Sequence, residues 1–175
     1  LKDFIHFIKY TGRRGPIKFK HIEEGAELMA NLTLRENLLL EFGIKQNTKS
    51  SVSELLIKNN RLALAKLVES IEDENLYPID ASTEDKKIIS IVKVLFHSSD
   101  YLFLEKPEKN LSDEKRVIFF EALLASKQKF NQTIIATGNK TPEEAEQLLG
   151  DNLVDLVGFG RNFLTNPDYP QRLEV

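Results

Sequence analysis

The sequence predicts an α/β protein with a mostly parallel sheet flanked by helices. Apolar runs that suit buried strands occur at 101–104, 132–137 and 153–157, and helical patterns at 112–127 and 141–150 separate them. Strands joined through a helix of this length form right-handed crossovers and lie parallel. Hydrophobic residues make up 41% of the chain and charged residues 29%, which is ordinary for a globular domain.

Two strand-like segments open the chain, at 4–8 and 17–22. The residues between them, Thr-Gly-Arg-Arg-Gly-Pro, are typical of a turn. Together they predict a small hairpin at the edge of the sheet.

Three helices are expected before the first buried strand. Thr33 begins one with a capping box, and Gly43 ends it. An apolar stripe predicts a longer helix over 52–71. Ser82 begins a third helix, whose segment 88–96 has so few polar residues that it should lie deep against the sheet.

A chain of 175 residues predicts a single domain. We expect it to divide into an N-terminal β element (1–30), a helical subdomain (31–80) and an α/β core (81–175). The longest nearly apolar stretch, 88–96, is far shorter than the roughly 20 residues of a spanning helix. No signal-peptide pattern opens the chain and it has no cysteine, so we expect a cytoplasmic protein without disulfides.

The net charge of −3 is unevenly distributed. Residues 1–20 carry six Lys or Arg against one Asp, a balance of +5, which leaves −8 for residues 21–175. The acidic remainder argues against a dedicated nucleic-acid-binding protein. The histidines have no ligand partners at metal-site spacing, so no metal site is predicted.

Residues 31–137 resemble the ATP-binding subunit of ABC transporters, and residues 143–146 and 151–160 are also similar to the part of that family that follows the switch. Asn-Leu-Thr-Leu-Arg-Glu-Asn-Leu at 31–38 is similar to the segment that opens that family's helical subdomain. Ser-Ser-Asp-Tyr-Leu-Phe-Leu-Glu-Lys-Pro at 98–107 looks like its Walker B strand and D-loop, and Thr-Ile-Ile-Ala-Thr at 133–137 looks like the strand before its switch histidine. The resemblance implies a P-loop-NTPase-like fold.

The residues that would perform ATP hydrolysis in that family are altered. No G-x-x-x-x-G-K-[ST] motif occurs, so a Walker A phosphate loop is absent. The Walker B acidic pair is replaced by Glu105 and Lys106, and a protonated lysine can neither accept a proton nor tolerate Mg²⁺ beside it.

Two further motifs of the family are also degenerate. Ser82, Thr83 and Glu84 stand at the signature position, and Gly138 stands where the switch histidine would be. The resemblance therefore implies a catalytically inactive pseudo-ATPase that acts as a binding or regulatory module, without a catalytic residue. Its partner would be another protein, a second copy of the chain, or a membrane transporter subunit.

The last part of the chain, 138–173, resembles the end of old yellow enzyme flavin oxidoreductases. In that family the positions equivalent to Gly138, Asn139, Gly160 and Arg161 hold the FMN phosphate through backbone N–H groups and a guanidinium. The resemblance implies a phosphate-binding or FMN-binding protein as the alternative function. A whole (β/α)₈ barrel of about 250 residues does not fit into this chain.

A third interpretation is a truncated or chimeric chain with no functional site. The sequence assigns no cofactor firmly, and MgATP and FMN are the two candidates. Whether the flavin-enzyme match reflects ancestry or convergence is left open by the residues themselves.

Overall fold

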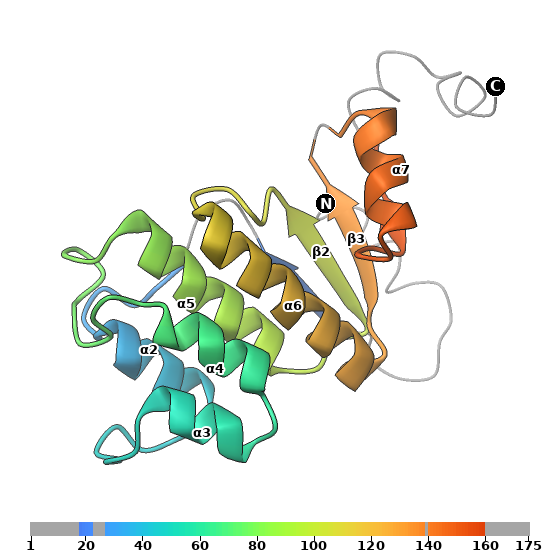
Figure 1. The fold of residues 1–175 in the computed structure, drawn as a ribbon. Helices are drawn as coiled ribbons and strands as arrows, with labels where there is room; N and C mark the ends of the chain where they lie inside the picture. The colour runs from blue at the N-terminus through green and yellow to red at the C-terminus, as the bar shows by residue number, and fades with distance from the viewer. Residues whose placement is uncertain (1–17, 23–26, 139, 160–175) are drawn as a thin grey trace.

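A computed structural model describes residues 18–22, 27–138 and 140–159. Its sheet has four strands, β1 (Phe19–Ile22), β2 (Tyr101–Glu105), β3 (Thr133–Thr137) and β4 (Leu156–Val157). All neighbouring strands are parallel, and they lie side by side in chain order, β1-β2-β3-β4. The predicted fold class, a parallel α/β sheet flanked by helices, is confirmed (Figure 1).

Six helices are described. They are α2 (Leu34–Glu41), α3 (Val52–Lys58), α4 (Leu62–Glu69), α5 (Thr83–Phe96), α6 (Asp113–Phe130) and α7 (Pro142–Gly150). The capping box that the sequence predicts at Thr33 forms, and Ser51 and Thr141 make two more at the starts of α3 and α7. Reciprocal bonds between the cap and the third residue satisfy N–H groups that a helix start leaves unpaired.

The single helix expected over 52–71 is wrong, because two short helices occupy this range. Asn60 has a φ of +54°, and Arg61 then precedes α4. A left-handed residue cannot continue an α-helix, and asparagine adopts this conformation more readily than most residues. The apolar stripe persists across the break because α3 and α4 pack against each other.

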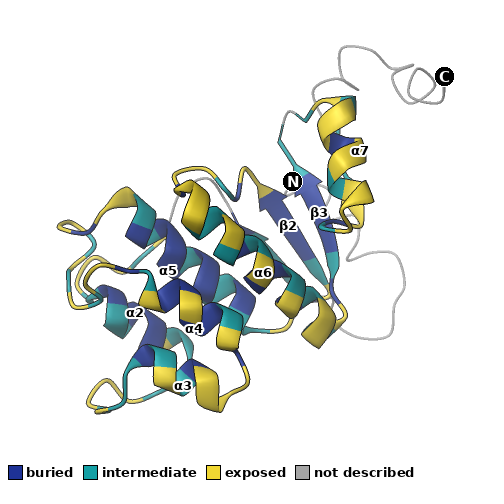
Figure 2. Cartoon of the chain, viewed as in Figure 1, coloured by how far each residue is buried: buried dark blue, intermediate teal, exposed yellow. Residues whose placement is uncertain are grey.

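The main core lies between the helices and one face of the sheet (Figure 2). Strand residues alternate between the two faces, and the core receives Leu102 and Leu104 from β2 with Ile134 and Ala136 from β3. Figure 1 shows α6 running alongside β2, with α5 next to α6. Leu148 of α7 packs against the same core, so the crossover helices cover one side.

The second face of the sheet carries Phe103 and Ile135, which are buried but stand outside that core. Phe19 extends the apolar surface on β1, with its ring centroid 6.0 Å from that of Tyr101 and 6.3 Å from that of Phe103. Buried side chains on both faces explain why β2 and β3 read as uninterrupted apolar runs.

The ends of the sheet differ from the sequence prediction. Residues 19–22 form a strand, but β1 pairs parallel with β2, and the hairpin partner expected at 4–8 lies outside the described residues. β4 is only two residues long instead of spanning 153–157. Asn152 has a φ of +55° just before this range, and Asp155 uses its carboxylate to accept a bond from Ile134 N–H at 2.8 Å.

Within the described ranges, no helix has the length and apolar character needed to span a membrane.

Candidate functional site

The carboxyl ends of the parallel strands bring together three residues that the sequence singles out. Glu105 ends β2 opposite Thr137, the last residue of β3. Lys106 and Gly138 follow these two residues directly, with φ angles of +44° and +89°. A Cβ on Gly138 would lie 3.6 Å from Glu105 Cγ and 3.8 Å from Lys106 Cγ, so the three residues lie close together. Open α/β sheets place ligands at this edge.

Gly138 presents backbone rather than side chain to this edge. Its φ of +89° lies in the region that residues with a Cβ adopt only under strain. Within the described part of the chain, its N–H donates to no acceptor. This leaves a donor suited to an anionic oxygen.

Gly158 stands beside it at the end of β4. Its own N–H is used, because it donates to Ala136 O at 2.8 Å. A Cβ there would lie 3.6 Å from Thr137 Cγ2 and 3.8 Å from Ala136 O, so the two strand ends approach closely. Asn139, Gly160 and Arg161, the other predicted phosphate-binding residues, lie outside the described residues.

Glu105 has a partner that the sequence did not suggest. Its Oε2 lies 3.7 Å from Nε2 of His21, which the parallel register of β1 and β2 brings alongside. The Glu105 carboxylate is half exposed at this edge of the sheet. Among the described residues, no group of three His, Asp or Glu side chains is arranged to hold a metal ion.

The residues at the signature position expected from the sequence have structural roles at helix starts. Ser82 caps α5 by accepting a bond from Asp85 N–H at 3.0 Å. Thr83 is the first residue of α5, and Glu84 accepts a 2.6 Å bond from Ser112 N–H at the start of α6. Lys115 Nζ is 3.1 Å from the other Glu84 oxygen. Glu84 therefore binds the N-terminus of α6, where a carboxylate is favoured by the helix dipole.

These contacts set the protonation of Glu84. Burial acts to raise its pKa, but the hydrogen bond from Ser112 and the charge of Lys115 outweigh it, so the pKa lies below its usual value. A depressed carboxyl pKa contributes stability above the unfolded-state pKa of about 4.3, and this contribution is lost as the pH falls through the folded-state pKa.

We expect Glu84→Gln to lower the free energy of unfolding by about 1 kcal/mol at pH 7, because the charged bonds to α6 are lost. The difference from the parent should shrink as the pH falls below the unfolded-state pKa of about 4.3 and through the lower folded-state pKa. Urea unfolding at pH values of about 3.5, 5 and 7 measures it. A deficit of equal size at all three values would contradict the assignment.

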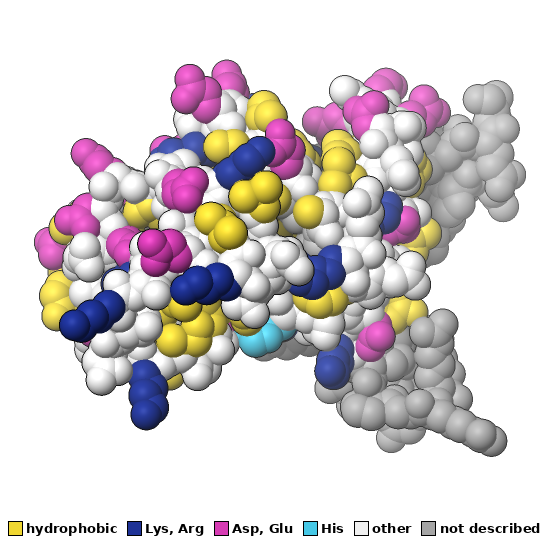
Figure 3. Space-filling view, turned by 60° about the horizontal axis from the view of Figure 1, so that its bottom comes forward, with side chains coloured by type: hydrophobic (Ala, Val, Ile, Leu, Met, Phe, Trp, Pro, Cys, Tyr) yellow, Lys and Arg dark blue, Asp and Glu magenta, His cyan; other side chains and the backbone are white. Residues whose placement is uncertain are grey.

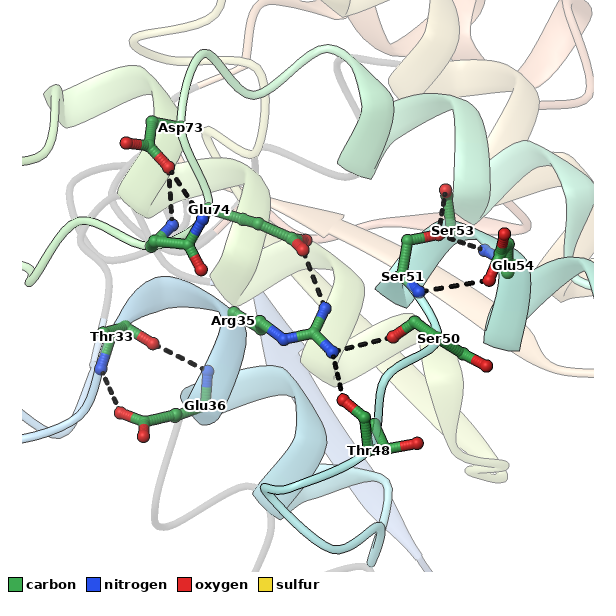
Figure 4. A network of polar contacts seen from close by, with 11 residues as sticks. Thr33, Arg35, Glu36, Thr48, Ser50, Ser51, Ser53, Glu54, Asp73 and Glu74 are labelled. Atoms are coloured by element: carbon green, nitrogen blue, oxygen red, sulfur yellow. Dashed lines mark hydrogen bonds and ion pairs between the residues drawn. The ribbon is translucent and has the colours of Figure 1, made fainter.

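A second polar network holds the helical part together, and the sequence does not predict it (Figure 4). Arg35 binds Glu74 Oε1 at 2.8 Å and donates to the carbonyls of Thr48 and Ser50. It ties α2 to two loops that are distant in the sequence. A charged residue on an amphipathic helix carries no signal for such long-range partners.

Comparison with known proteins identifies the family. Residues 60–175, about two thirds of the chain, match the sequence profile of the NADH:flavin oxidoreductase / NADH oxidase family. The chain belongs to that family. The match begins at the break before α4, well upstream of residue 138, where the resemblance to flavin enzymes in the sequence itself begins.

Two curated plant proteins are similar to this flavin oxidoreductase family member. 12-Oxophytodienoate reductase 1 of Oryza sativa subsp. japonica is 37% identical over 75 residues, which is 43% of this chain and 20% of that protein. A 12-oxophytodienoate reductase-like protein of Solanum lycopersicum is 40% identical over 62 residues, which is 35% of this chain and 18% of that protein. The chain thus spans about a fifth of the length of these relatives.

The shape of the flavin oxidoreductase family member resembles a different class of protein. A solved ATP-binding subunit of an ABC transporter matches with a TM-score of 0.56, covering 74% of this chain and 51% of the other. The identity is 18%, so this likeness concerns the fold alone. The ABC-like fold expected from the sequence is therefore present in a chain whose family is that of the flavin oxidoreductases.

Proposed function

We propose that this chain is a phosphate-ligand-binding module of the flavin oxidoreductase family, and that it takes FMN at the carboxyl edge of β3 and β4. The observation that carries the proposal is Gly138, which directly follows β3 inside the family match. It has a positive φ and an N–H that meets no acceptor in the described part of the chain. The phosphate of FMN needs such donors, and a glycine lets the backbone approach it.

The residues present fit the phosphate end of the cofactor. Lys106 adds a positive charge beside Gly138. Arg161, placed by sequence shortly after β4, would supply a guanidinium that matches phosphate oxygens. When bound, FMN supplies hydride and electron transfer. Because the chain spans about a fifth of its curated relatives, we propose binding only and no turnover by this chain alone.

The test is an FMN titration of the full chain followed by flavin fluorescence. We expect Gly138→Ala to weaken FMN binding at least tenfold, a loss of about 1.4 kcal/mol, because the new side chain strains the backbone that meets the phosphate. Riboflavin, which lacks the phosphate, should be unaffected by the substitution.

Gly43→Ala is the matched control, since Gly43 has a φ of +67° at the end of α2 and a Cβ added there would meet no atom within 4 Å. Both substitutions place alanine at positive φ and should lower stability similarly, but only the one at Gly138 should change FMN affinity. Equal FMN affinity in both variants would refute the site, as would an absence of FMN binding by the parent.

We propose as a second candidate a cytoplasmic pseudo-ATPase-like binding module that docks a protein partner or a second copy. Lys106 favours it, since this residue follows β2 where the related fold carries an acidic pair. The helical subdomain 31–80 and the turn at 109–111 would form the docking surface. Such a module acts by binding its partner and does not turn over ATP.

This second candidate predicts no Mg²⁺-dependent ATP hydrolysis above buffer. Lys106 has no lone pair in its protonated form, so it cannot polarise an attacking water. The double change Glu105→Asp with Lys106→Glu should not restore hydrolysis, because the chain has no phosphate loop. A phosphate-release assay measures ATP hydrolysis by the parent chain and by the double variant. Turnover by the parent that Lys106→Ala abolishes would overturn the pseudo-ATPase proposal.

A further inference from the structure

A hollow of about 290 Å³ lies between β1, the loop before α2, the end of α2 and the second half of α5. Lys20 and His21 of β1, Glu27, Glu41 of α2, and Ser90, Lys93 and Val94 of α5 line it. It shares no residue with the glycine edge of β3 and β4. Its size suits a small anion or a short metabolite better than a nucleotide, since pockets for drug-sized ligands run from about 300 to 1,000 Å³.

Two ammonium groups in this hollow share one carboxylate. Lys20 Nζ lies 3.8 Å from Glu41 Oε1, and Lys93 Nζ lies 3.8 Å from Glu41 Oε2. These separations exceed the roughly 2.7–3.2 Å of a hydrogen bond. Within the described residues neither ammonium donates a hydrogen bond to any protein group. Both side chains are partly buried, at 31% and 21% exposure, so water reaches them mainly from the open side.

Glu41 is itself held from the other side. His97 Nε2 lies 3.0 Å from Glu41 O and 3.3 Å from Glu41 Oε1. Both neighbours are acceptors, so this nitrogen carries the proton and donates. Phe42 and Phe96 stack beside it with ring centroids 3.9 Å apart, which fixes the end of α2 against the end of α5. The carboxylate is thus anchored by His97 and leaves the donors of the two lysines available to the hollow.

We propose that this hollow binds an oxyanion, the phosphate or carboxylate group of a small molecule, between the ammonium groups of Lys20 and Lys93. Oxyanion oxygens would complete the charge-assisted hydrogen bonds that Glu41 is too distant to make. The hydroxyl of Ser90 is the further donor in the lining. Glu27 at the rim opposes the anion and limits its affinity.

On the face of the molecule that Figure 3 shows, charged side chains of both signs are interspersed among the described residues. In Figure 3 acidic side chains gather over α7 and along the left side of the view, and basic side chains are separated from one another.

The experiment is thermal unfolding of the full chain against inorganic phosphate and, separately, succinate, each compared with chloride at equal ionic strength. Stabilisation by either anion supports the site, and the two arms separate phosphoryl from carboxylate ligands. Lys93→Met should raise the apparent Kd at least tenfold, and Lys93→Arg should keep it within about threefold because the charge remains.

Lys86→Met is the matched control, since Lys86 lies on the same helix outside the lining. It should leave the Kd unchanged, while Glu27→Gln should lower the Kd about threefold by removing a like charge from the rim. The proposal is overturned if neither anion stabilises the parent, or if the Lys93→Met and Lys86→Met variants bind alike. Inorganic phosphate is also a ligand for the site proposed at Gly138, so only the stabilisation that Lys93→Met removes and Gly138→Ala leaves counts for this hollow. FMN binding that Gly138→Ala weakens reports on the other site, so the two failures are recognised separately.

Discussion

Phe119→Ala is expected to lower the free energy of unfolding by about 4 kcal/mol. Phe119 is fully buried on α6, within the core that α5, α6 and the sheet enclose. Removing a buried phenyl ring costs its transfer free energy together with the energy of the cavity left behind, about 3–5 kcal/mol in all. For a chain of this size such a loss lowers Tm by roughly 8–16 °C. Calorimetry or urea unfolding measures it.

Val117→Ala on the same helix is the matched control, because Val117 is 61% exposed. It should change the free energy of unfolding by no more than about 0.5 kcal/mol. Similar losses in the two variants would show that α6 does not pack on the sheet as described. A loss of stability in Phe119→Ala alone supports the packing of α6 in the main core, between the helices and one face of the sheet.

The parts of the fold that the sequence predicts well are those with a strong local signal. β2 and β3 are uninterrupted apolar runs, and both are buried on two faces. The helix starts at Thr33 and Thr141 carry capping boxes that need only four residues to form. In each case the cause of the structure lies within a few residues of its effect.

The break between α3 and α4 shows where a local pattern misleads. Apolar periodicity continues across Asn60, because both helices present apolar faces to the same interior. Arg61 at the break is only 6% exposed, donates to Leu95 O and stacks 4.8 Å from the Phe130 ring centre. Its charge is buried, and desolvation lowers its pKa. The sequence around Arg61 carries no pattern that predicts its contacts with α5 and α6.

The candidate site also has a part that the sequence predicts and a part that it does not. That Glu105, Lys106 and Gly138 meet follows from the strand assignments, because neighbouring parallel strands end at one edge. His21 beside Glu105 depends on β1 pairing with β2, whereas the sequence favoured a local hairpin. The hollow at Lys20 and Lys93 depends on the same pairing. The non-local pairing of β1 with β2 therefore explains why the sequence predicted neither the His21–Glu105 pair nor the hollow.

Asn37→Leu should lower the free energy of unfolding by about 3 kcal/mol, because it leaves buried backbone groups without partners. Asn37 is 2% exposed on α2 and uses its whole amide. Its Oδ1 accepts from Met29 N–H at 2.9 Å, and its Nδ2 donates to the carbonyls of Met29, Leu32 and Thr33 at 3.1, 3.2 and 2.9 Å. Leucine fills similar space but cannot replace these bonds, and each buried orphan costs about 1–3 kcal/mol.

Asn47→Leu tests the same change at an exposed asparagine and should cost no more than about 0.5 kcal/mol. Asn37→Asp separates the acceptor from the donors. It keeps an oxygen for Met29 N–H, but it turns a carboxylate toward three carbonyls, which raises the pKa of the new acid. A raised carboxyl pKa destabilises the fold as the pH rises, so this variant should be less stable at about pH 7 than at about pH 4 relative to the parent. Urea unfolding at both pH values measures the difference, and a variant as stable as the parent at neutral pH would show that the amide donors do not hold the loop before α2.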